Sequence, residues 1–128
     1  MRYWETLLEE DRGGLKIILD KTWEDIHPGQ CFDDTVTDID DMCSKIDRGD
    51  LDWFVARARV LVDGVELADA CIGGLLYEDA REFLKDGMAE DLISDAVAEA
   101  QGRLTTLAKT FTMLAIKHSY HKDRPWKQ

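Results

Sequence analysis

Acidic side chains gathered between residues 33 and 52 are the first candidates for chemistry, because clustered carboxylates can bind calcium. An EF-hand loop needs oxygen ligands at its first, third and fifth positions, glycine at the sixth and glutamate at the twelfth. A loop that starts at Asp38 fails, since Met42 and Cys43 occupy the fifth and sixth positions. A loop that starts at Asp50 fails at Phe54. The stretch therefore predicts no specific calcium site.

Thiol and imidazole side chains are the second candidates, for zinc binding or for nucleophilic catalysis. Structural zinc sites use paired ligands a few residues apart, and the cysteines and histidines here match no tight ligand pattern: His27, Cys31, Cys43, Cys71, His118 and His121. A cysteine–histidine pair is arithmetically possible, but the chain has no phosphate-binding glycine loop and no nucleophile elbow. We expect no metal, no cofactor and no enzymatic activity; an uncharacterised enzyme is the third functional alternative.

Charge divides the chain into an acidic part and a basic end. Residues 1–100 contain 26 Asp or Glu and 10 Lys or Arg, a net charge of −16, whereas residues 101–128 contain 1 acid and 6 bases, a net charge of +5. The whole chain carries −11. An imbalance of this size bears on partners or solubility rather than on the fold. We expect no direct binding of the acidic part to nucleic acid or to an anionic membrane, because both would repel it.

The acidic residues give the leading functional hypothesis, which is mimicry of nucleic acid. Duplex DNA carries one charge per ~1.7 Å, so carboxylates concentrated on one face would imitate a phosphate backbone and occupy a basic groove. We predict a non-enzymatic small acidic protein that binds and inhibits a basic nucleic-acid-handling protein. Small acidic proteins that phages and mobile elements use against host defence are similar in charge and size alone. A solvated acidic face is the other interpretation. The predicted partner-binding residues are Asp33, Asp34, Asp38, Asp41, Asp47 and Asp50.

The middle of the chain predicts one antiparallel β-hairpin, over about residues 53–77. Aromatic and β-branched residues alternate with polar ones on both sides of Asp63-Gly64. This dipeptide suits a two-residue turn, because both positions tolerate positive φ. Gly73-Gly74 in the second strand indicates a bulge or a close approach of another backbone.

The remaining segments predict helices. Apolar residues spaced by three and four indicate a long C-terminal helix over about residues 88–118, and shorter helices are expected over residues 2–11, 15–26, 33–47 and 78–86. The predicted fold class is α+β, with several helices packed around the hairpin. Residues 1–118 are expected to form a single compact domain, and residues 119–128 a basic, mobile tail.

The apolar seam of the long helix gives the second functional hypothesis. Positions beside the seam are mostly small and uncharged, which suits packing against several neighbours, either within this chain or in a multi-helix dimer. In the second case the protein is an oligomeric adaptor, of the immunity or antitoxin type. An ordinary core helix is the alternative. The predicted oligomer seam of a homodimer is Leu104, Leu107, Phe111 and Leu114.

Cysteine usage and the absence of targeting signals indicate the compartment. Three cysteines with no close pair fit reduced thiols better than a disulfide framework. The first residues show no signal-peptide core, and no run approaches the ~18 apolar residues of a membrane span. We therefore expect a cytoplasmic protein.

Overall fold

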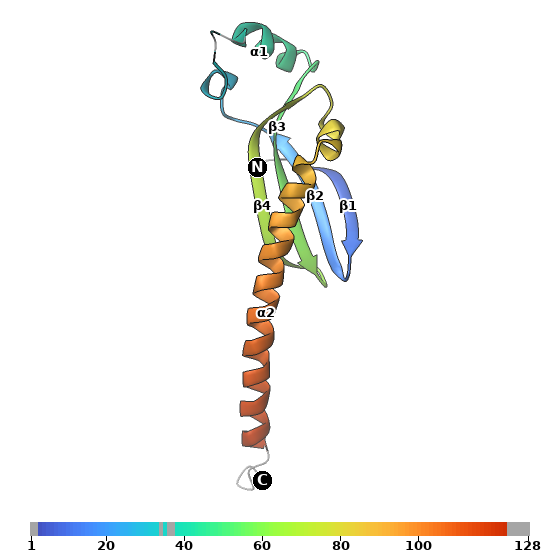
Figure 1. Ribbon diagram of the computed structural model, residues 1–128, viewed down its shortest axis with the longest axis vertical. Helices are drawn as coiled ribbons and strands as arrows, with labels where there is room; N and C mark the ends of the chain where they lie inside the picture. Colours follow the sequence, from blue (N-terminus) through green and yellow to red (C-terminus); the bar gives the residue numbers. More distant parts are fainter. Residues whose placement is uncertain (1–2, 34, 36–37, 123–128) are drawn as a thin grey trace.

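The computed structural model describes residues 3–33, 35 and 38–122 (Figure 1). Its four strands form one antiparallel sheet in the order β1-β2-β3-β4, and the long helix α2 packs on one face of this sheet. The predicted α+β class is therefore confirmed. The elements, in chain order, are β1 (Glu5–Arg12), β2 (Leu15–Trp23), the 3-10 helix η1 (Pro28–Gln30), α1 (Ile39–Asp47), β3 (Asp52–Val62), β4 (Val65–Tyr77), the 3-10 helix η2 (Ala80–Lys85) and α2 (Met88–Lys122).

Two hairpins with the same kind of turn build the sheet. Gly13 and Gly14 join β1 to β2 with φ of 57° and 88°, and Asp63 and Gly64 join β3 to β4 with φ of 51° and 79°. Two consecutive residues with positive φ match the twist of the flanking strands. The predicted hairpin is confirmed as β3–β4, and its bulge at Gly74, with φ of 67°, is present where the register with β3 shifts.

The first hairpin corrects two of the expected helices, over residues 2–11 and 15–26. Leu15, Ile18 and Leu19 have helical spacing, but the side chains of β2 alternate between the two faces of the sheet. Ile17 and Leu19 are fully buried in the core, and Ile18 lies half-buried on the other face. Because β2 is apolar on both faces, the spacing of its apolar residues also fits one side of an amphipathic helix.

Three other boundaries also differ from the prediction. The helix expected over residues 33–47 begins only at Ile39, and the one expected over residues 78–86 is the short 3-10 helix η2. Helix α2 continues to Lys122, so the first residues of the predicted tail are helical. The rest of that tail, residues 123–128, lies outside the described residues.

The inner half of α2 (residues 88–100) packs on β3 and β4 through small side chains. Alanines are buried on both sides of this contact, so the helix can lie close to the strands. One end of the core is closed by Phe83 of η2, whose ring packs edge-on against Phe54 and Tyr77 at 5.8 Å in both cases. The buried alanines are Ala56, Ala58 and Ala68 in the sheet and Ala89, Ala96 and Ala100 in α2.

The face of the sheet opposite α2 contains a buried carboxylate, that of Asp20. Arg57 donates two hydrogen bonds to it, from Nε to Oδ1 at 3.0 Å and from Nη2 to Oδ2 at 2.8 Å. Arg59 adds a third, at 3.2 Å, and the ring of Trp4 covers the Arg57 guanidinium at 3.8 Å. Asp20 is 2% exposed. A buried carboxylate needs such pairing because desolvation penalises an isolated charge.

We expect Asp20→Asn to lower the free energy of unfolding by about 3 kcal/mol, because it leaves two arginines without their counter-charge. Asp69→Asn is the matched control, since Asp69 is exposed and lies beside Arg59 in the register of β3 with β4. It should change stability by less than about 0.5 kcal/mol. Urea denaturation of both variants tests this, and equal effects would show that the buried cluster contributes nothing particular.

Candidate functional site

The predicted partner-binding carboxylates lie in the segment between β2 and β3. We call the part of this segment that contains them, residues 33–50, the acidic lobe. This segment, with α1, lies at the opposite end of the molecule from the C-terminal end of α2 (Figure 1). Asp34 lies outside the described residues. The five that the structure describes are all exposed: Asp33, Asp38, Asp41, Asp47 and Asp50.

Two of these carboxylates organise the backbone of the lobe. Asp38 is the N-cap of α1 and accepts the backbone N–H of Asp41 at 3.0 Å. Asp33 accepts the backbone N–H of Thr35 at 2.9 Å and its hydroxyl at 2.8 Å. These hydrogen bonds favour the ionised form and lower the pKa of Asp33. Asp33 therefore holds the turn at Thr35 in its ionised form, and Asp38 holds the start of α1.

Local ion pairs screen part of the charge on α1 and the turn after it. Asp41 lies 3.1 Å from Lys45 one helical turn on, and Asp50 lies 3.1 Å from Arg48. Exposed pairs of this kind contribute little to stability. Asp47 occupies the last position of α1, where the helix dipole disfavours a negative charge. Of the carboxylates in and beside α1, Asp47 is therefore the one whose position does not favour the helix, whereas Asp38 and Asp41 do.

The residues just before the acidic lobe pack on the end of the sheet, and α1 packs on η1. Ile39 and Met42 are the buried residues of α1. The rings of Phe32 and Trp53 pack with centroids 5.8 Å apart, and the Trp53 indole N–H donates to the carbonyl of Ile26 at 2.8 Å. The carboxylates are thus presented on a folded element rather than on a free loop.

Positive charge in the body of the protein is largely engaged by its own carboxylates. Because most basic side chains of the body pair with carboxylates of the same chain, the remaining acidic side chains determine the sign of the surface potential. The basic residues between positions 3 and 100 that form ion pairs are Arg12, Lys16, Lys21, Lys45, Arg48, Arg57, Arg59 and Arg81.

His27 and Cys43 form the one thiol–imidazole pair that the structure brings together among its described residues. Cys43 Sγ lies 3.6 Å from His27 Nε2, beside a cavity of about 350 Å³ between the acidic lobe and the sheet. The backbone N–H of Gly29 donates to His27 Nδ1 at 3.0 Å. A neutral imidazole that accepts at Nδ1 carries its proton on Nε2. His27 therefore donates toward the thiol, and this geometry does not make it a base for Cys43.

The other possible zinc ligands are not assembled around this pair. Within the described residues, no group of three or more His, Cys, Asp or Glu side chains is arranged to hold a metal ion. His118 lies near the outer end of α2, whereas His27 precedes η1 (Figure 1). His121 lies in the part of α2 whose side chains are not described.

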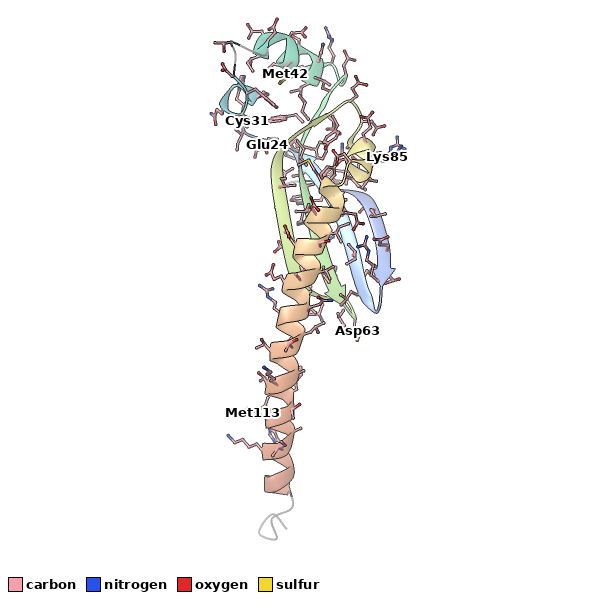
Figure 2. All side chains as sticks on the ribbon, in the orientation of Figure 1. Glu24, Cys31, Met42, Asp63, Lys85 and Met113 are labelled. Carbon is pink, nitrogen blue, oxygen red and sulfur yellow. The ribbon has the colours of Figure 1, made fainter. Side chains whose placement is uncertain are left out.

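A second candidate surface is the outer segment of α2 (residues 101–118), which extends beyond the sheet (Figure 2). The predicted oligomer seam runs along it: Leu104 is half-buried, and Leu107, Leu114 and Phe111 are 37%, 45% and 62% exposed. Met113 and Ile116 are exposed as well. A helix that is apolar on more than one side normally packs against neighbours. The prediction of a plain core helix holds only for the inner half of α2.

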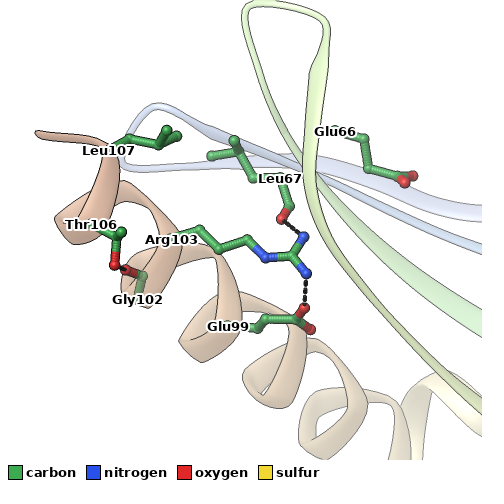
Figure 3. A pocket seen from close by; sticks show the side chains of 7 residues that line it. All are labelled: Glu66, Leu67, Glu99, Gly102, Arg103, Thr106 and Leu107. Carbon is green, nitrogen blue, oxygen red and sulfur yellow. Dashed lines mark hydrogen bonds and ion pairs between the residues drawn. The ribbon is translucent and has the colours of Figure 1, made fainter. Parts of the chain in front are cut away.

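An open groove of about 440 Å³ marks the place where the outer segment leaves the sheet (Figure 3). Leu67 of β4 and Leu107 of α2 supply its apolar walls. Arg103 bridges its base, since its guanidinium donates to the carbonyl of Leu67 and lies 2.7 Å from Glu99. No sequence pattern predicted this groove. The residue that could have pointed to it is Gly102, a glycine inside a helix with no capping role.

Comparisons with protein-family models, with curated proteins and with solved structures found no match for this chain.

Within the described part of the chain, no helix combines the length and the apolarity that a membrane span needs.

Gly102 is exposed, and a side chain at this position would not clash with other residues of the same chain. A Cβ atom built there meets nothing within 4 Å. We therefore expect Gly102→Ala, in dilute solution, to raise the free energy of unfolding by about 1 kcal/mol through helix propensity. Gly87→Ala is the contrasting variant, because Gly87 has φ of 91° and alanine is strained there. The midpoint of urea denaturation should rise for Gly102→Ala and fall for Gly87→Ala. A loss of stability in both variants would contradict the conclusion that Gly102 tolerates a side chain.

Proposed function

We propose that this chain is a non-enzymatic binding protein that occupies, and thereby inhibits, the basic surface of a nucleic-acid-handling protein. The observation that carries the proposal is the pairing of the body's basic side chains with its own carboxylates, which leaves acids in excess on the surface. The three cysteines are free, which supports a cytoplasmic setting.

The acidic lobe is the part of this surface best suited to contact the partner. Its carboxylates are exposed, they come from one short segment, and the residue before that segment, Phe32, packs on Trp53 of β3. Charges held on an ordered element give up less conformational freedom on binding than charges on a free loop. Electrostatic complementarity of this kind increases the association rate and makes binding sensitive to salt.

An adaptor of the immunity or antitoxin type is the second candidate function. The specific observation in its favour is the exposed outer segment of α2, where Phe111 is 62% exposed. The enzyme alternative would have to use Cys43 and His27, and the hydrogen bond from Gly29 holds His27 as a donor. The structure gives that alternative no further support.

The proposal is tested by reversing charge in the acidic lobe. We expect Asp41→Lys, Asp47→Lys and Asp50→Lys, combined in one chain, to weaken partner binding at least about tenfold. These positions avoid the capping role of Asp38, so the fold should be kept. Partners are recovered on tagged protein from a lysate of the natural source, eluted in a rising salt gradient, and challenged with duplex DNA or RNA.

A control chain with the same change in net charge carries Asp11→Lys, Glu82→Lys and Asp95→Lys, which are exposed positions outside the lobe. It should retain binding within about threefold. Recovery of a nucleic-acid-binding protein that nucleic acid displaces supports the proposal. Equal loss in both chains would show that total charge, and not the lobe, is recognised. Binding unchanged in the lobe variant would reject the lobe as the site.

A further inference from the structure

We propose that the outer segment of α2 pairs with the same segment of a second copy of this chain, in an antiparallel, two-fold symmetric dimer. In this dimer the end of each helix lies against the groove beside Leu67 of the other copy. The inference rests on the shape and charge of α2 and does not depend on the identity of the basic partner.

Continuity of the seam is the first reason. Ile93 and Ala100 lie on the same side of α2 as Leu107 and Phe111, because their spacings of three and four keep them on one stripe. The first two are fully buried against the sheet, and the last two are exposed beyond its edge. The stripe that is covered by the chain's own sheet therefore continues, uncovered, into the outer segment.

Symmetry about Phe111 is the second reason. In an antiparallel pair centred on this residue, positions equally far before and after it lie at the same level, so Leu107 comes beside Leu114 and Ala115, and Leu104 comes beside His118. On α2 the groove extends from Glu99 to Leu107. Its outer end, at Leu107, lies at the level of Ala115 of the second copy. A two-fold interface needs such self-complementarity, with a groove and a filling segment at equal distances from the axis.

Charge selects the antiparallel orientation over the parallel one. The outer segment contains three basic residues, Arg103, Lys109 and Lys117, and no acidic one. A parallel pair would place each Lys117 beside its copy and bring together two bodies whose first hundred residues each carry −16. In the antiparallel pair the bodies lie at opposite ends. The basic outer segment of each copy then lies toward the acidic body of the other, beside a groove lined by Glu66, Glu99 and the Arg103 that pairs with Glu99.

Light scattering and sedimentation equilibrium of the full chain test the dimer. The wild type should be dimeric, and Leu107→Asp should weaken dimerisation at least about a hundredfold, since two charges would enter the interface. Ile116→Asp is the matched control: Ile116 is exposed and lies nine residues, about two and a half turns, from Leu107, on the opposite side of the helix. It should change dimerisation less than about threefold.

Cysteine cross-linking tests the orientation, in a chain whose own cysteines are replaced by serine. Leu104→Cys and His118→Cys should form a disulfide when the two variants are mixed and oxidised, and neither should do so alone. A monomeric or larger wild-type species, a dimer that survives Leu107→Asp, or a cross-link between two Leu104→Cys chains would overturn the proposal.

Discussion

Close packing of alanines between the inner half of α2 and the β3–β4 hairpin determines the direction in which α2 leaves the sheet. Ala96 and Ala100 of the helix and Ala58 and Ala68 of the sheet are almost completely buried. Small side chains on both sides let a helix approach a sheet closely and fix its direction. Because α2 is 35 residues long, about 52 Å, it must pass beyond the sheet once its first turns are held there. The exposed outer segment is a direct consequence.

The same contact separates two surfaces of opposite character. One end of the molecule carries the acidic lobe, and the other carries a helix that is basic and apolar (Figure 1). The body pairs its own bases internally, with Asp20 between Arg57 and Arg59 as the most buried example. We propose that the lobe binds a basic partner and the outer segment binds a second copy. In the antiparallel dimer the two lobes point away from each other, so each remains free to bind.

Sequence patterns predicted the features that depend on local chemistry. Asp63-Gly64 and the long stripe of α2 were sufficient for the second hairpin and the C-terminal helix, because this dipeptide favours a tight turn and a sustained repeat of three and four favours a helix. The first hairpin was missed. Gly13-Gly14 forms a turn of the same kind, but Ile18 makes β2 apolar on both faces, and that pattern also fits a helix. The pairing of β2 with β3 distinguishes the two.

Placement of the candidate surfaces depended on long-range contacts that no local pattern contains. The sequence identified the carboxylates of the acidic lobe, but only the fold brings α1 to the end of the sheet. It identified Leu107 and Phe111 as a seam, but not that the sheet ends before them. The groove is lined by Leu67 and Arg103, which are distant in the chain and come into hydrogen-bond contact only because α2 packs on β4.

Because the acidic lobe and the outer segment of α2 lie at opposite ends of the molecule, we expect them to bind their partners independently. The most direct test is the affinity of the monomeric Leu107→Asp variant for the basic partner, together with the mass of the complex by light scattering. We predict an unchanged affinity per chain and a complex with one copy of each protein, where the wild type gives two of each. Loss of partner binding together with the dimer would contradict this independence.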